Sequence, residues 1–228
     1  MKKTFPIPVR AVMIDLDGTL LDTIRDLAAA TNLMLEHLGH APLPLEVVRT
    51  FVGKGIPRLV ERALARDING HTDAPAVAAA LPVFERFYAE VNGRHATIYP
   101  GVREGLEQFR AGGFQLACVT NKSGAFTEPL LKRTDLAHFF AQIISGDTLP
   151  RKKPDPMQLL HACAQFGLPP ERMLMIGDSG NDALAARAAG CPVFCVPYGY
   201  NEGQPVQSLD VDAIVGSLVD CIPLIRKD

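Results

Sequence analysis

The chain has 228 residues, and its composition of 47% hydrophobic and 21% charged residues favours one folded domain with a modest insertion. Lys and Arg number 23 against 25 for Asp and Glu, so the formal charge of −2 excludes a broad basic surface for nucleic acid. No apolar run reaches the roughly 18 residues of a membrane span, so we expect no membrane association. The five cysteines include no CxxC pair, and we expect them to be buried thiols in a reducing cytoplasm.

The first predicted element is a strand over residues 9–16, a nearly continuous apolar run that is typical of a parallel strand buried on both faces. The helical spacing of apolar residues then predicts a helix from about residue 22 to residue 38, before Gly39. From there to about residue 95 the sequence shows only helical patterns, so we expect an all-helical insertion. Its other predicted helices cover residues 45–51, 56–65 and 76–90.

After residue 99 the predicted helices and strands alternate, which indicates right-handed βαβ crossovers. The expected fold class is α/β, with a doubly wound, Rossmann-like parallel sheet. We place the α/β core domain in residues 1–21 and 96–228 and the helical domain in residues 22–95. The expected helices are residues 102–110, 124–133, 156–166 and 181–189, and the expected strands are residues 115–120, 142–145, 173–176 and 193–196.

Polar residues stand at or beside the carboxyl ends of several predicted strands. They are Asp15, Asp17, Thr120, Lys153, Asp178 and Asp182. Each one alone has an ordinary explanation as a turn residue, a helix cap or a solvated lysine. Because parallel strands end at the same edge of a sheet, where α/β proteins bind their ligands, the whole set predicts one functional site.

The chemistry that suits this set of groups is phosphoryl transfer. Carboxylate oxygens suit Mg²⁺, and the metal and Lys153 together offset the charge of a phosphoryl group that Thr120 positions. Asp15 can attack the phosphorus atom, and Asp17 can protonate the leaving oxygen and then activate water. The sequence thus predicts a Mg²⁺-dependent enzyme that acts on a small phosphorylated metabolite.

Four motifs carry a family resemblance. DLDGTLLDT, VTNK, KKPDP and GDSGND, in this order and at these spacings, resemble the motifs of the haloacid dehalogenase superfamily, and the helical insertion is similar to its type 1 cap. The resemblance implies that Asp15 is the nucleophile and a metal ligand, and that Asp17 transfers protons and binds the metal through its backbone carbonyl. It also implies metal ligation by Asp178, phosphate contacts by Thr120, Asn121 and Lys153, and support of these groups by Asp182.

The substrate is less constrained by the sequence, because selectivity in such a fold comes from the cap. FVGKGIP, YPGV, TNKSGAFTEPLL and CVPYGYN are similar to segments of bacterial phosphoglycolate phosphatases, which implies 2-phosphoglycolate as a substrate. Lys54, between two glycines of the cap, is the candidate for binding a substrate carboxylate. A phosphatase for another phosphosugar, a phosphomutase, a phosphonatase using Lys54 and a signalling receiver domain are the alternatives.

Overall fold

A parallel sheet forms the centre of the structure, a computed structural model that describes residues 4–228. Its strands are β2 (Ala11–Ile14), β5 (Gln115–Val119), β6 (Gln142–Ile144), β7 (Met173–Gly177), β8 (Val193–Cys195) and β9 (Ala213–Ile214). All neighbours pair in parallel in the order β6-β5-β2-β7-β8-β9. The predicted α/β fold is therefore confirmed. The strand that precedes Asp15 lies between the strands that precede Thr120 and Asp178.

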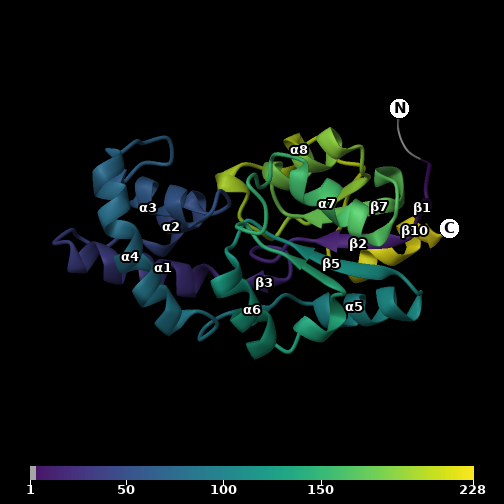
Figure 1. The fold of residues 1–228 in the computed structure, drawn as a ribbon, viewed down its shortest axis with the longest axis horizontal. Helices are drawn as coiled ribbons and strands as arrows, with labels where there is room; N and C mark the ends of the chain where they lie inside the picture. Colours follow the sequence, from purple (N-terminus) through teal and green to yellow (C-terminus); the bar gives the residue numbers. More distant parts are fainter. Residues whose placement is uncertain (1–3) are drawn as a thin grey trace.

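Helices cover both faces of this sheet (Figure 1). They are α5 (Val102–Ala111), α6 (Gly124–Arg133), α7 (Met157–Phe166) and α8 (Gly180–Ala189). Val12 and Ile14 of β2 pack in the hydrophobic cluster that contains residues of α5 and α6, whereas Ala11 and Met13 pack with α7 and α8. This alternation follows from the pleat of a strand, which directs successive side chains to opposite faces. It explains why the whole of β2 is apolar.

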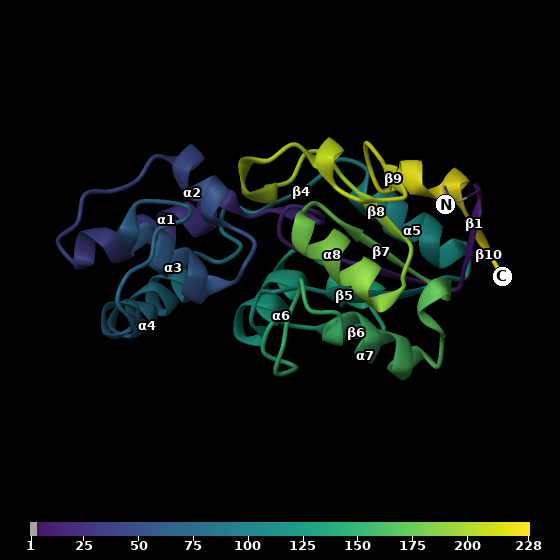
Figure 2. The ribbon, with the colours of Figure 1, turned by 90° about the horizontal axis from the view of Figure 1, so that it is seen from above.

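A group of helices lies beyond one end of the sheet (Figures 1 and 2). The chain leaves through β3 (Leu21–Asp22) and returns through β4 (Thr97–Ile98), which pair in an antiparallel arrangement. The helices between these strands are α1 (Ile24–His37), α2 (Leu45–Phe51), α3 (Ile56–Ala65) and α4 (Ala74–Val91). Their apolar faces share one hydrophobic cluster, to which Phe126 and Tyr200 are the contributions from outside the group. The division into domains at residues 22 and 95 stays a prediction.

The apolar run at residues 9–16 differs from the single strand that we expected. Val9 ends β1 (Ile7–Val9), which pairs with β10 (Ile225–Lys227) in a separate two-stranded sheet. The exposed Arg10 separates β1 from β2. The remaining elements are the short 3₁₀ helices η1 (Ala137–Phe139), η2 (Pro170–Arg172), η3 (Asn201–Gly203), η4 (Val206–Ser208) and η5 (Val219–Leu224). Within residues 4–228, no helix has the length and hydropathy that crossing a membrane requires.

Candidate active site

Asp15 occupies the first position after the central strand β2. Its backbone N–H donates to the carbonyl of Ile176 at 3.0 Å, so the pairing with β7 continues up to this residue and fixes its direction. The carboxylate oxygen Oδ1 accepts from the backbone N–H of Leu16 at 2.7 Å and forms an ion pair with Lys153 at 3.0 Å. Burial raises the pKa of Asp15 to about 7, because Lys153 only partly offsets the loss of water and Asp182 adds repulsion.

Lys153 is buried between two carboxylates. Its ammonium donates to the carbonyl of Val119 at 2.7 Å and to Oδ1 of Asp182 at 2.7 Å, in addition to its contact with Asp15. Burial alone would lower its pKa, but Asp15 and Asp182 outweigh that effect and raise it, so the side chain stays charged. The sequence pattern alone also allowed a solvated lysine at this position, and the structure excludes that interpretation.

Asp182 supports this arrangement from the first turn of α8. Its Oδ2 accepts from the backbone N–H and the hydroxyl of Ser179, at 3.2 and 2.8 Å, in a capping box at the helix start. Its Oδ1 accepts from Lys153. Both oxygens of Asp182 are therefore occupied by protein donors, as expected of a residue that orients Lys153.

Asp178 follows β7, and its carboxylate lies close to the backbone of Gly18 and Tyr200. Its oxygens accept from the hydroxyl of Thr19 at 3.2 Å and from the backbone N–H of Tyr200 at 2.7 Å. Gly18 has a φ of +85°, and a Cβ there would lie 2.3 Å from Oδ2 of Asp178, so only glycine fits. Burial, followed by the charges of Asp182 and Asp15, raises the pKa of Asp178 well above its ordinary value.

The carboxylates fit a metal ion. One oxygen from each of Asp15, Asp178 and Asp182 lies within 4.8 Å of the others, and all three side chains are buried. Among the residues that the structure describes, Lys153 is the cation in direct contact with this group, so one positive charge faces three carboxylates. A divalent cation with oxygen ligands would balance the remaining charge. The motif resemblance implies Asp15 and Asp178 as the ligands, and the contacts of Asp182 with Lys153 and Ser179 agree with a supporting place for Asp182.

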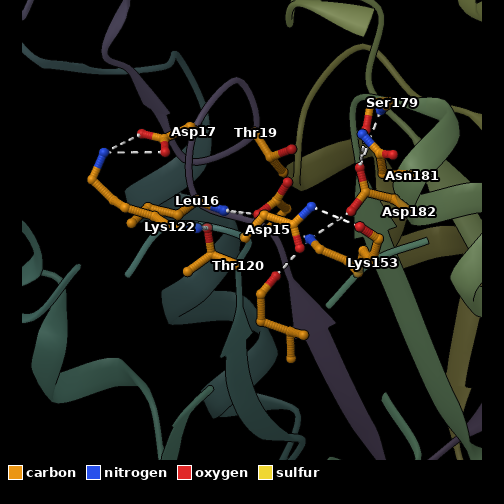
Figure 3. Close-up of polar contacts among 12 residues, drawn as sticks. Asp15, Leu16, Asp17, Thr19, Thr120, Lys122, Lys153, Ser179, Asn181 and Asp182 are labelled. Atoms are coloured by element: carbon orange, nitrogen blue, oxygen red, sulfur yellow. Dashed lines mark hydrogen bonds and ion pairs between the residues drawn. The ribbon is translucent and has the colours of Figure 1, made fainter. Parts of the chain in front are cut away.

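Asp17 faces a second lysine. Its Oδ1 accepts from the hydroxyl of Thr23 at 2.7 Å, and the ammonium of Lys122 donates to Oδ1 and Oδ2, each at 3.1 Å. Figure 3 shows Lys122 and Lys153 on opposite sides of Asp15. The two predicted catalytic carboxylates are thus held by two different buried lysines.

Thr120 and Asn121 follow β5 and line the same pocket as Asp15 and Asp17. The hydroxyl of Thr120 accepts from the backbone N–H of Lys122 at 3.2 Å, which leaves its proton available to an oxygen of a ligand. The amide of Asn121 instead donates to the carbonyls of Gly53 and Lys153, at 3.0 and 2.8 Å. Asn121 thereby holds the loop before α3 against the core, and its contact with phosphate stays a prediction.

The helices α1 and α3 and the loop before α3 close one side of this pocket. Their contributions to the lining are Leu27, Val52, Gly53, Gly55, Ile56 and Leu59. Lys54 is not among the described residues that line it. Its ammonium lies 3.3 Å from Oε1 of Glu202, and 44% of its side chain is exposed. The predicted contact of Lys54 with substrate therefore needs a different side-chain conformation and stays a prediction.

The comparison with known proteins agrees with this geometry. The sequence model of the haloacid dehalogenase-like hydrolases matches residues 9–190. The chain belongs to this family. The resemblance that the four motifs carry is thereby confirmed.

Three proteins similar to this hydrolase bear the name phosphoglycolate phosphatase. One from Nitrosospira multiformis is 58% identical over 223 residues, which is 98% of each chain. One from Thiobacillus denitrificans is 51% identical over 225 residues, which is 99% of each chain. A crystal structure from Haemophilus somnus, described as a predicted phosphoglycolate phosphatase, superposes with a TM-score of 0.88 at 32% identity and covers 94% of this chain and 96% of its own.

Sequence reasoning missed two groups in this haloacid dehalogenase-like hydrolase. Lys122 belongs to the VTNK motif, so its place in a motif was the available signal. Tyr200 lies in the CVPYGYN segment, and its hydroxyl accepts from the backbone N–H of Thr23 at 2.7 Å and donates to Asp22 at 2.9 Å. Because its backbone N–H also donates to Asp178, Tyr200 connects a candidate metal ligand to the start of α1.

Proposed function

We propose that this hydrolase is a Mg²⁺-dependent phosphatase that cleaves 2-phosphoglycolate through an aspartyl phosphate on Asp15. The position of Asp15 carries the proposal. Asp15 directly follows the central strand of the sheet, and its carboxylate forms an ion pair with the buried Lys153. It lines a pocket together with Asp17, Thr120 and Asp178. The names of the relatives from Nitrosospira multiformis and Thiobacillus denitrificans support the choice of substrate.

The first step is attack by Asp15 on the phosphorus atom. Lys153 and Leu16 both contact Oδ1, so we assign the attack to Oδ2. The bond from phosphorus to the glycolate oxygen breaks as the bond to Asp15 forms, and Asp17 gives its proton to the departing oxygen. In the second step Asp17 takes a proton from water, which attacks the phosphorus and releases phosphate and Asp15.

Several residues offset negative charge during these steps. The ammonium of Lys153 and the hydroxyl of Thr120 stabilise the phosphoryl oxygens. Mg²⁺ held by Asp15, Asp178 and the backbone carbonyl of Asp17 would add positive charge at the same oxygens. Lys153 and Asp182 keep Asp15 oriented, because both are buried and joined at 2.7 Å.

The position of the nucleophile supports a phosphatase over a receiver domain. Asp15 ends the first strand of the main sheet, and the helices α1 to α4 follow it, whereas a receiver has no such insertion. All five cysteines are buried and none forms a disulfide within residues 4–228, which supports a place in the reducing cytoplasm.

The test is turnover of a panel of phosphate monoesters with Mg²⁺, with Asp15→Asn as the control. The expected result is the highest kcat/KM for 2-phosphoglycolate, with release of inorganic phosphate. Transfer of the phosphoryl group between positions of a sugar phosphate, without release, would favour the phosphomutase. A phosphorylated protein that persists after substrate removal would favour the receiver.

A further inference from the structure

Lys122 has an unusual environment for a lysine. It lies just after β5, and only 5% of its surface is exposed. Its ammonium donates to both oxygens of Asp17, each at 3.1 Å, and to the hydroxyl oxygen of Tyr88. Because an ammonium has three N–H donors and no acceptor, these three contacts use its full hydrogen-bonding capacity.

Tyr88 comes from α4, in the helical insertion, and is completely buried. Its ring packs against Phe84 of the same helix and against Phe126 of α6, with centroid distances of 5.4 and 4.8 Å. These contacts fix the ring, and so the position of its hydroxyl. The contact between Tyr88 and Lys122 therefore joins the insertion to the residue that holds Asp17.

The charge of Lys122 is stable in this environment. Burial alone would lower its pKa, but the carboxylate of Asp17 and the oxygen of Tyr88 outweigh burial and raise the pKa above its ordinary value. A charged, fully bonded ammonium has one preferred position. The carboxylate of Asp17 is correspondingly fixed by Lys122 on both oxygens and by Thr23 on Oδ1.

We propose that Lys122 and Tyr88 are positioning residues for Asp17, so that proton transfer by Asp17 depends on contact between α4 and the core. The inference rests on the proton-transfer role of Asp17 in the proposed function. Proton transfer needs a donor oxygen within hydrogen-bond reach of the leaving oxygen, and a small displacement of the carboxylate costs rate. Lys122 acts through Asp17, and Tyr88 acts through Lys122.

The test uses the chemistry of the leaving group. Departure of an alkoxide from 2-phosphoglycolate needs a proton from Asp17, whereas p-nitrophenolate leaves without one. The parameter kcat/KM includes the steps up to departure of the leaving group, so it isolates this role. The decrease of kcat/KM in Asp17→Asn measures complete loss of the acid, and the other variants are compared with it.

The informative variants are Tyr88→Phe, Lys122→Met and the double variant. For 2-phosphoglycolate we expect kcat/KM to fall by roughly 10-fold in Tyr88→Phe and by roughly 100-fold in Lys122→Met. The complete contribution of general acid–base catalysis is roughly 100- to 10,000-fold, so these losses correspond to partial loss of the acid. For p-nitrophenyl phosphate the losses should be several-fold smaller. Lys132→Met, which changes a lysine with 73% of its side chain exposed, is the matched control and should have wild-type activity.

The double variant shows whether Tyr88 acts through Lys122 or has an independent effect on the reaction. If Tyr88 acts only through Lys122, the double variant should be no slower than Lys122→Met, because coupled residues are not additive. Multiplied losses would overturn the proposal. Equal losses on both substrates would also overturn it, since they would indicate a role in docking the helices or in folding. Tyr88→Phe keeps the aromatic ring, so this comparison remains decisive if Lys122→Met does not fold.

Failure of the proposed function and failure of this inference would give different experimental results. A wild-type protein that cleaves p-nitrophenyl phosphate but not 2-phosphoglycolate would contradict the proposed substrate alone. The same variants would then be compared on glycerol phosphate or another alkyl ester that the wild type cleaves. Absence of turnover with every phosphate ester would contradict both the function and the inference.

Discussion

The ammonium of Lys153 lies 3.0 Å from Oδ1 of Asp15, and both side chains are almost fully buried. The pair joins the end of β2 to the loop after β6, and the ammonium also contacts the carbonyl of Val119 at the end of β5. The buried ammonium therefore contacts groups at the carboxyl ends of two neighbouring strands, β2 and β5. Substitution of Asp15 and substitution of Lys153 should therefore have different effects on stability.

Asp15→Asn should abolish turnover and leave the protein folded. An amide of the same shape cannot attack phosphorus, so we expect kcat to fall by more than about 1,000-fold. The variant also removes a carboxylate whose pKa burial raises to about 7, so stability in EDTA at neutral pH should not decrease. Steady-state kinetics and urea unfolding measure the two effects. Retention of a tenth of the wild-type kcat would rule out Asp15 as the nucleophile.

Lys153→Met should destabilise the metal-free protein as well as inactivate it. Asp15 and Asp182 would lose their shared cation, and removal of one partner from a buried ion pair typically costs about 3–5 kcal/mol. The exposed Lys132→Met is the matched control, with an expected change within about 0.5 kcal/mol. Urea unfolding at pH 7 in EDTA provides the measurement. Equal stability of the two variants would show that Lys153 contributes no net charge stabilisation.

Binding of Mg²⁺ should stabilise the protein more at high pH than at low pH. Burial raises the pKa of Asp15 from 3.8 to about 7, so the folded metal-free protein binds more protons than the unfolded chain between these values. This contribution to stability is present below the unfolded pKa and is lost as the pH rises through the folded pKa. Metal ligands must be deprotonated, so protons compete with Mg²⁺ at low pH.

The measurement is the increase in Tm on adding saturating Mg²⁺ at about pH 5 and at about pH 8. We expect a small increase at the lower pH and a larger one at the higher pH. Asp178→Asn, which removes a candidate ligand, should reduce the increase at both. An increase that is independent of pH would contradict binding at these buried carboxylates.

The order of elements in the core was predictable, because strands buried on both faces appear as short apolar runs between amphipathic helices. The convergence of Asp15, Thr120 and Asp178 followed from it, since each residue directly follows one of three adjacent parallel strands. The pairing of β1 with β10 was not predictable, because its partners come from opposite ends of the chain. No local pattern in residues 225–227 indicates a strand.

Lys122 illustrates why part of the site was not predictable. A lysine after a strand is usually solvated, and the groups that bury and bind this one are distant in the sequence. Its contact with Tyr88 spans 34 positions, and its contact with Asp17 spans 105. The contact with Tyr88 depends on the docking of α4 against the core, and the contact with Asp17 depends on the pairing of β2 with β5. Tertiary packing, which a single sequence does not display, therefore decides the environment of this lysine.

Substrate selectivity should depend on Lys54. Its neighbours Gly53 and Gly55 line the pocket, so its side chain starts at the rim, although its ammonium now contacts Glu202. Glu202 also accepts from the buried Arg62 at 2.7 Å and keeps that partner when Lys54 turns away. Lys54→Ala should therefore lower kcat/KM for 2-phosphoglycolate by roughly 10-fold, as expected for loss of a hydrogen bond to a charged group.

The same variant should change turnover of p-nitrophenyl phosphate little, because that substrate has no carboxylate. Lys132→Ala, on the exposed surface of α6, is the matched control for loss of a lysine. Equal losses on both substrates would place Lys54 in phosphate binding or in closure of the pocket. Unchanged kinetics on both substrates would limit Lys54 to its ion pair with Glu202. Selectivity for a carboxylate would then have to come from other groups at the pocket, such as Asn121 and the backbone N–H groups at the start of α3.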